Sequence, residues 1–336
     1  MTPPYDNRRR NDERLGDRAR GDTWPAEIRT SRRRASGGRR GRGAGPRRSN
    51  CSAAPKRWGT HFMQTKSVGG LRVIYRADDT EAAAIVEDAC LRSIRVISDT
   101  WGVPLPGDCR VYVMTSWMRF MFDSAPWPWR LLMVITLPLW FSRTRSLWRY
   151  AGGWTQRFGR RTAVGVKPPR LMSTADKSIG ERIFIREDDV TKKVRHVTCH
   201  ELTHAFMAHL RLPSWLNEGL AMVTVDRFFG KPTVRQETLA TLGPRSSAGR
   251  PQDSARVNLA DKDTIIRHYV RGYWIARYLA ETDLEFIRNL LRMRVSRREL
   301  ESRIAAKLGV SPKALWTEVD AIVLSHFGQP APADPG

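Results

Sequence analysis

The feature that most constrains this chain is a pair of histidines four residues apart, within the segment TCHELTH at 198–204. Residues four apart lie on the same face of an α-helix, so His200 and His204 can direct two imidazoles at one point. The sequence predicts that this helix begins near Asp188 and ends before Pro213, because proline cannot continue a helix. The pair therefore predicts a helix that presents two metal ligands.

Zinc chemistry accounts for the polar residues of this segment. Zn2+ accepts imidazole nitrogen at about 2.0–2.1 Å, and catalytic zinc sites keep three protein ligands and a water. Glu201 lies beside the first ligand, where a carboxylate can take a proton from that water. The alternative is an ordinary helix with two histidines, but four of the chain's seven histidines fall between 196 and 209. His196, one turn before His200, is a rival ligand, and His209 points to the opposite side as a structural residue.

A third ligand is expected at Glu218, with thirteen residues between it and His204. Pro213 ends the first helix and Ser214 is a suitable N-cap for a second, so the chain can return this carboxylate to the histidines. Apolar residues flank Glu218 on both sides, which predicts burial and disfavours a surface glutamate. Because a buried carboxylate without a partner is costly, a Zn2+ ion held by His200, His204 and Glu218 is the preferred interpretation.

The elements around this segment predict an α+β fold. Strands are expected at 71–76, 109–116 and 182–187, with a helix at 79–100. A helix begins near Ser214 after the HELTH helix, a polar loop covers 240–262, and further helices are expected at 263–281, 283–294, 297–308 and 311–327. Because the strands precede residue 190 and the helices follow it, the two kinds of element are segregated along the chain.

The two ends of the chain differ in composition from the 63–328 domain. Residues 1–62 hold 17 Lys or Arg against 6 Asp or Glu and lack apolar periodicity, so disorder is expected. This segment is either a basic arm for nucleic acid or an anionic membrane, or it precedes the true start at Met63. The tail at 329–336 is also expected to be disordered.

No signal peptide and no membrane-spanning segment are expected. The N-terminus lacks an apolar core region, and the longest apolar run, at 131–141, has 11 residues and contains Pro138. The four cysteines form no CxxC pair and no dense disulfide framework, although Cys90 and Cys109 could pair. A cytoplasmic protein, with membrane association left open, is the expected localisation.

A stretch at 124–175 contains no acidic residue, nine Lys or Arg and five of the twelve tryptophans. Trp and Arg around a short apolar run suit an anionic membrane surface, because indole and guanidinium groups tolerate the headgroup zone. The alternatives are an insertion packed on the domain core or a contact between copies of the chain. Nucleic-acid binding is a weaker explanation of the same positive charge, since the sequence contains no nucleic-acid recognition module.

The motifs resemble the gluzincin metallopeptidases, in particular the bacterial group called peptidase MA-like. The likeness rests on HELTH at 200–204 and on PSWLNEGLA at 213–221, which is also similar to the third-ligand segment of zinc aminopeptidases. It covers roughly 67–328. The resemblance implies a zincin-like fold, with a small mixed or antiparallel sheet before the active-site helix and a mainly helical C-terminal part.

The resemblance also implies roles for individual residues. The zinc ligands would be His200, His204 and Glu218, and the general base would be Glu201. A tyrosine or histidine from a later helix would stabilise the oxyanion. Tyr269 fits the Y-x-x-G pattern of the family, with Tyr273 one turn on as the alternative, and either tyrosine could equally be a packing residue.

Three departures from related patterns qualify this resemblance. Many gluzincins place an acid four residues after the third ligand to orient the first histidine, but Met222 occupies that position here, so Asp226 or a backbone carbonyl would have to replace it. The GxMEN-type motif of aminopeptidases is absent, which favours an endopeptidase. Leu210 replaces the third histidine of metzincins.

The expected function is zinc-dependent hydrolysis of a peptide or protein substrate, with Glu201 as general base. The edge of the strand at 182–187 could pair with an extended peptide. The alternative is a zinc-stabilised binding protein without turnover, which binds a partner or a membrane surface. This alternative stays open because Met222 occupies the position where many gluzincins have the orienting acid.

Overall fold

The strands of this chain form one five-stranded mixed sheet. In the computed structural model, the described residues are 63–172, 179–242, 262–293 and 295–328. The basic arm expected at 1–62, the tail at 329–336 and most of the polar loop expected at 240–262 lie outside these ranges.

The sheet has the strand order β1-β2-β3-β5-β4. It is antiparallel at both edges and parallel where β3 pairs with β2 and with β5. Gly69 and Gly70 turn the chain between β1 and β2 with φ values of 55° and 89°, a region that side chains disfavour. The strand bounds are β1 (Met63–Val68), β2 (Leu71–Arg76), β3 (Asp108–Val113), β4 (Gly153–Phe158) and β5 (Arg161–Val166).

The described α-helices form two groups along the chain, those up to α6 and those after it. The first group is α1 (Thr80–Trp101), α2 (Trp117–Ser124), α3 (Trp127–Tyr150), α4 (Pro169–Met172), α5 (Gly180–Ile183) and α6 (Val190–Met207). The second group is α7 (Ser214–Phe229), α8 (Lys262–Thr282), α9 (Leu284–Arg292), α10 (Arg297–Lys307) and α11 (Leu315–Phe327).

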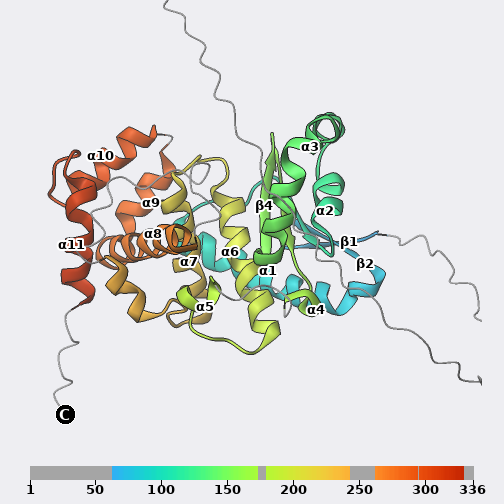
Figure 1. Ribbon diagram of the computed structural model, residues 1–336, viewed down its shortest axis with the longest axis horizontal. Coiled ribbons are helices and arrows are strands. Elements are labelled where there is room, and N and C mark those ends of the chain that lie inside the picture. The colour runs from blue at the N-terminus through green and yellow to red at the C-terminus, as the bar shows by residue number, and fades with distance from the viewer. Residues whose placement is uncertain (1–62, 173–178, 243–261, 294, 329–336) are drawn as a thin grey trace, which may run out of the picture. The chain divides into compact units, whose positions relative to one another are not determined.

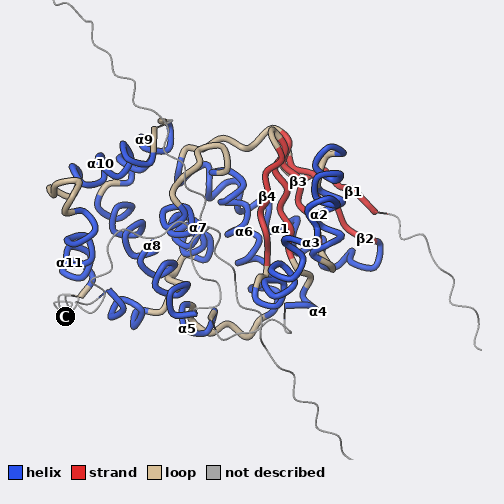
Figure 2. The backbone as a smooth tube through the Cα atoms, turned by 45° about the horizontal axis from the view of Figure 1, so that its top comes forward, coloured by secondary structure: helices blue, strands red, loops and turns tan. Residues whose placement is uncertain are grey.

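The two faces of the sheet carry different apolar clusters, because successive side chains of a strand point to opposite faces. On β3, Val111 and Val113 join the main core with α1 and α6. Tyr112 of the same strand joins a second cluster with Phe120 of α2 and Met133 of α3. Figures 1 and 2 show α2 and α3 on one side of the strands and α6 on the other.

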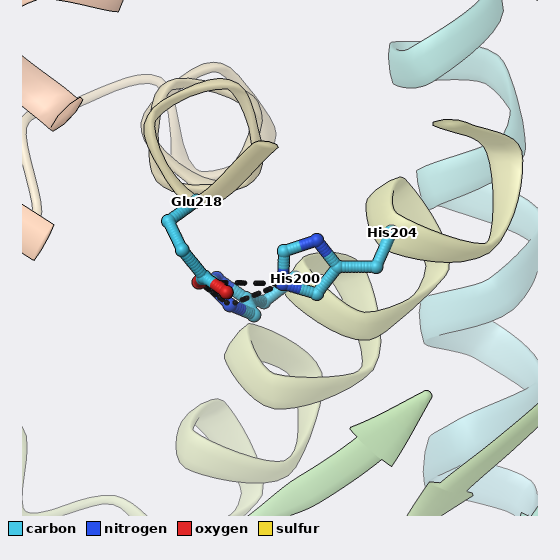
Figure 3. Close-up of side chains that lie close together, drawn as sticks. All are labelled: His200, His204 and Glu218. Carbon is cyan, nitrogen blue, oxygen red and sulfur yellow. Dashed lines mark hydrogen bonds and ion pairs between the residues drawn. The ribbon is translucent and has the colours of Figure 1, made fainter. Parts of the chain in front are cut away.

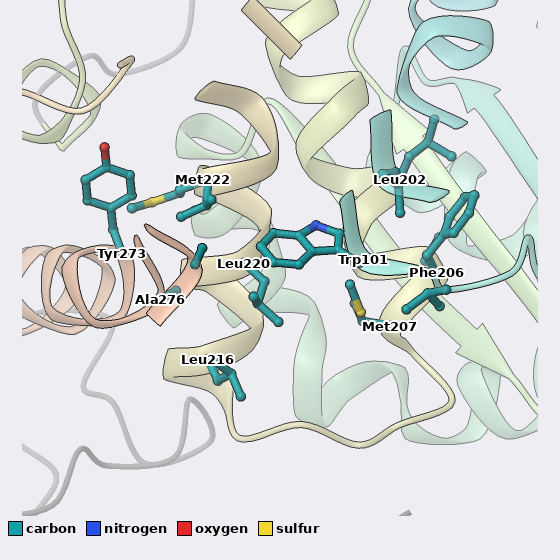
Figure 4. Close-up of a cluster of buried hydrophobic side chains, with 14 of the residues drawn as sticks. Trp101, Leu202, Phe206, Met207, Leu216, Leu220, Met222, Tyr273 and Ala276 are labelled. Carbon is teal, nitrogen blue, oxygen red and sulfur yellow. The ribbon is translucent and has the colours of Figure 1, made fainter. Parts of the chain in front are cut away.

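The helices after α6 extend the main core away from the sheet. α7 packs between α6 and α8, and α8 in turn contacts α9 and α11. Buried side chains from α1, α6 and α7 meet in this core, including Trp101, Phe206 and Leu220 (Figure 4). Trp101 also donates a hydrogen bond of 2.8 Å to Thr224 Oγ1, so its indole nitrogen is satisfied inside the core.

The α+β class predicted from the sequence is confirmed, since a mixed sheet precedes a run of helices. The prediction of a strand at 182–187 is wrong. Gly180–Ile183 is helical, and Phe184 forms only an isolated antiparallel bridge to Val234. The backbone of this segment pairs with 233–235, after α7, through Ile185 N to Thr233 O at 2.8 Å, and so does not join the sheet.

The hairpin of β4 and β5 was not predicted. It falls within 124–175, so the second half of the stretch expected as an insertion provides two strands of the sheet. The final helix begins at Leu315, later than the 311 expected. None of the helices in the described ranges combines the length and the apolar character needed to cross a bilayer.

Candidate metal centre

The helix that carries HELTH is α6, and Asp189 caps its N-terminus. The Asp189 side chain accepts hydrogen bonds from the backbone N–H groups of Thr191 and Lys192, at 2.8 and 3.2 Å. The helix ends at Met207, earlier than expected, and Arg211 adopts a φ of 52° in the turn toward α7. This left-handed residue lets the chain reverse within a few residues.

The expected N-cap of α7 is wrong in detail. Ser214 is the first helical residue and Pro213 is the capping residue, without a side-chain hydrogen bond. The Ser214 hydroxyl instead lies 3.1 Å from His268 Nε2, on α8. Proline suits this position because it has no N–H that the helix would need to satisfy.

His200, His204 and Glu218 converge as the spacing predicts (Figure 3). The two imidazole Nε2 atoms are 3.0 Å apart. Glu218 Oε2 lies 3.3 Å from His200 Nε2 and 3.4 Å from His204 Nε2. The turn after α6 therefore brings a carboxylate from α7 back to both histidines.

These separations fit a metal ion. Two ligand atoms at about 2.0–2.1 Å from a tetrahedral centre are about 3.3 Å apart, close to the three distances observed. Glu218 Oε2 is buried and makes no other hydrogen bond within the described residues. Two imidazoles and one carboxylate leave a fourth position for water, which is the donor set of a catalytic zinc site.

Glu218 and His204 strongly shift each other's pKa values. Burial alone would raise the pKa of the Glu218 carboxyl, but the imidazoles of His204 and His200 hold it well below its usual range. Burial alone would lower the pKa of His204, but the charge of Glu218 outweighs it and raises the pKa to about 9. The site thus confines opposite charges where water has little access, an environment that also suits a divalent cation.

Glu201 points toward the sheet and is held by β4. The Thr155 hydroxyl lies 2.7 Å from Glu201 Oε2 and 2.9 Å from the backbone oxygen of the same residue. A Cβ at Gly153 would lie 2.5 Å from Glu201 Cγ, so only glycine leaves room for this side chain. β4 therefore fixes the candidate base beside the first histidine.

The other two histidines of the segment are structural. His196 packs edge-on against Phe184 at 5.0 Å, and burial followed by the charge of His200 lowers its pKa to about 3. It is not among the converging ligand atoms. His209 Nδ1 lies 2.9 Å from Phe206 O. The rival ligand is thus excluded from the cluster by its aromatic packing.

The two candidate tyrosines occupy different environments. The charges of Glu218 and Glu201, together with burial, raise the pKa of Tyr269 well above its usual value, so its ring lies within the field of the metal centre. Tyr273 is fully buried and donates a hydrogen bond of 2.7 Å to Asp226 Oδ2. Tyr273 is therefore committed to a partner away from the cluster.

The expected carboxylate behind the histidines is not Asp226. Its other oxygen accepts hydrogen bonds of 2.6 Å from the Thr233 N–H and hydroxyl, so both oxygens are used. Met222 is buried in the core between α7 and α8 (Figure 4). Among the described residues, neither His200 Nδ1 nor His204 Nδ1 has a hydrogen-bond partner.

Sequence reasoning missed Thr155 and Gly153. Both lie in a stretch whose tryptophans and arginines drew attention to a surface role. The alternation of β5, with its small and β-branched residues at 161–166, was the available signal for a strand there.

No protein-family model matches this chain, and no curated protein matches it significantly.

Proposed function

We propose that this protein is a zinc-dependent metallopeptidase of the gluzincin type, acting as an endopeptidase. The observation that carries the proposal is the convergence of His200, His204 and Glu218, with ligand atoms 3.0–3.4 Å apart. Glu201, next to the first ligand, is held separately by a hydroxyl from the sheet. A purely structural cluster would not require this second carboxylate.

The fold supports a zincin-like architecture. A mixed sheet lies against the helix that bears the two histidines, and the third ligand comes from the next helix. β4 is antiparallel to its neighbour and lies at the edge of the sheet beside α6. The role of substrate-pairing edge, expected for 182–187, therefore passes to β4, where an extended peptide would add a strand.

When bound by the three ligands, zinc would supply an activated water and a polarised scissile carbonyl. Glu201 takes the proton of the attacking water and passes it to the leaving amine. Thr155 keeps the carboxylate of Glu201 oriented for this transfer. Tyr269 donates a hydrogen bond to the oxyanion of the tetrahedral intermediate.

The first test is Glu201→Gln. The amide keeps the shape of the side chain and cannot accept the proton, so the variant should bind zinc stoichiometrically and lose hydrolysis of casein or a peptide library. Metal content by mass spectrometry and cleavage by fluorescence report the two properties independently. Full activity in this variant would rule out the mechanism.

Metal binding itself is tested by His204→Ala beside His209→Ala. Both variants remove an imidazole from the same region, but only His204 belongs to the converging cluster. The first should lose zinc and the thermal stabilisation that zinc gives to the wild type, and the second should retain both. Equal zinc retention in the two variants would contradict the assignment of ligands.

The second candidate function is zinc-stabilised binding without turnover. The observation favouring it is that His200 Nδ1 lacks a hydrogen-bond partner in the described part of the chain, whereas catalytic zinc ligands are usually oriented through this atom. Wild-type protein that carries zinc but cleaves no member of a peptide library would favour it.

A further inference from the structure

The N-terminal half of α3 leaves an unusual set of apolar side chains in solvent. Nine large hydrophobic residues of the described chain are exposed, and six of them lie between 127 and 135. The exposed fractions are 73% for Trp127, 68% for Ile135 and about half for Leu131, Leu132 and Val134. Scattered exposed apolar residues are normal in proteins, but a contiguous cluster indicates a surface that meets something apolar.

These side chains form one face of the helix. Trp127, Leu131, Val134 and Ile135 follow the spacing that places residues on one side of an α-helix. The opposite side carries Met133, which is 7% exposed and packs in the cluster beneath. The exposed face is therefore the side of α3 turned away from the sheet, and from Trp127 to Ile135 it extends for about 12 Å along the helix.

The orientation of this face is fixed by contacts to the sheet. Trp129 meets Phe158 of β4 edge-on, with ring centroids 5.8 Å apart. Arg130 Nε donates a hydrogen bond of 2.8 Å to Ala125 O, which secures the turn between α2 and α3. The helix cannot turn its apolar face inward without losing these contacts.

The charge around this face indicates what covers it. From 124 to 175 the sequence has nine basic residues and no acidic one, within a chain of net charge +24. The sequence of α3 itself contains four arginines and no acidic residue. A second copy of the chain would bring the same positive region against itself, which is electrostatically unfavourable. A surface that is both anionic and apolar would complement the positive charge of this stretch and cover the exposed apolar side chains at 127–135.

We propose that the N-terminal half of α3 docks this protein onto the surface of an anionic lipid bilayer. The apolar face enters the boundary between headgroups and acyl chains, as amphipathic interfacial helices do, to a depth of about 5–10 Å. Trp127 suits this boundary because indole has an apolar body and a polar N–H. Since α3 and α6 lie on opposite sides of the sheet (Figure 1), the helix that carries the histidine pair is on the side away from the docking face.

The test uses the full-length protein and a pair of matched double variants. Leu131→Glu with Ile135→Glu places two charges on the α3 face. Leu91→Glu with Ile185→Glu makes the same two changes at exposed apolar positions outside α3, where the exposed fractions are 44% and 53%. All four side chains are exposed, so both proteins should fold, and circular dichroism checks this.

Co-sedimentation is measured with phosphatidylcholine vesicles, with and without phosphatidylglycerol, at low ionic strength. Wild type should bind the anionic vesicles, and the α3 double variant should bind at least about tenfold more weakly, because two lipid-inserted side chains are lost. The Leu91 and Ile185 control should bind within about twofold of wild type, because neither position lies on the docking face.

Three outcomes would overturn the proposal. Wild type that fails to bind anionic vesicles excludes a lipid partner. Equal binding by wild type and the α3 variant assigns the attraction to basic residues elsewhere, such as those at 1–62. Self-association in the ultracentrifuge that the α3 variant abolishes, without vesicle binding, identifies a second copy as the occupant.

Discussion

Gly219 of α7 and Gly272 of α8 pack backbone against backbone. A Cβ at Gly219 would lie 2.2 Å from Gly272 O, and a Cβ at Gly272 would lie 2.2 Å from Trp215 O. Both distances are far shorter than any van der Waals contact. Gly219 directly follows Glu218, a candidate metal ligand, and Tyr269 lies three residues before Gly272. This contact therefore sets how closely the candidate oxyanion residue approaches the metal centre.

Gly272→Ala should force α7 and α8 apart. Overpacking at a rigid backbone contact costs about 1–3 kcal/mol or more in the free energy of unfolding, measured by urea denaturation. The same displacement should lower kcat, because Tyr269 moves with α8. Gly180→Ala is the control, since a methyl group added at Gly180 would have no neighbour within 4 Å, and it should leave stability nearly unchanged. An unaltered denaturation midpoint in Gly272→Ala would refute the packing argument.

The two tyrosines should respond in opposite ways to removal of their hydroxyls. Tyr269→Phe should lower kcat by about tenfold to a thousandfold, the range for loss of one oxyanion donor, with zinc content and stability unchanged. Tyr273→Phe should remove the hydrogen bond to Asp226 Oδ2 and cost about 1–3 kcal/mol of stability, with little effect on kcat of the folded enzyme. Steady-state kinetics and urea denaturation of both proteins separate the roles. The reverse pattern would assign the oxyanion to Tyr273.

Thr155 is expected to act as a positioning residue for Glu201. Thr155→Val keeps the shape of the side chain and removes the hydroxyl that lies 2.7 Å from the carboxylate. We expect kcat to fall about tenfold, as for loss of an orienting hydrogen bond of about 1.4 kcal/mol, with KM and zinc content unchanged. Thr155→Ser restores the hydroxyl and should recover most of the activity. If valine and serine behave alike, the hydroxyl has no positioning role.

Asp108 joins three strands of the sheet through arginines. Burial alone would raise its pKa, but hydrogen bonds from Arg110, Arg161 and Arg72 outweigh burial and lower the pKa to about 2. Because the folded pKa lies below the unfolded value, the ionised carboxylate contributes stability above about pH 4, and this contribution is lost as the pH falls toward 2.

Asp108→Asn should therefore destabilise the protein by roughly 1–2 kcal/mol near pH 7, after allowance for partial solvent screening. The difference from wild type should shrink as the pH falls below about 4, which urea denaturation at several pH values would show. Asp188→Asn, at a highly exposed ion pair with Arg186, is the matched control and should change stability far less. A difference between Asp108→Asn and wild type that is independent of pH would contradict the electrostatic origin.

How far the sequence predicts this site depends on the range of the interactions involved. The histidine pair and Glu201 follow from helix periodicity, which is a local property of the chain. The return of Glu218 follows from Pro213 and a short turn, so it also needed only neighbouring residues. The two histidines and Glu218 were predicted to converge from spacing and burial alone, and their geometry agrees.

The sequence alone predicted the convergence of His200, His204 and Glu218 and the α+β class, because both rest on local periodicity and on the order of elements. Only the tertiary structure decided that β4 supports Glu201, that Tyr273 is bonded to Asp226, and that 182–187 pairs with 233–235. Strand pairing and helix packing join residues far apart in the chain. A short segment such as RIFIRE at 182–187 can pair with several other segments, and its sequence alone does not specify which one.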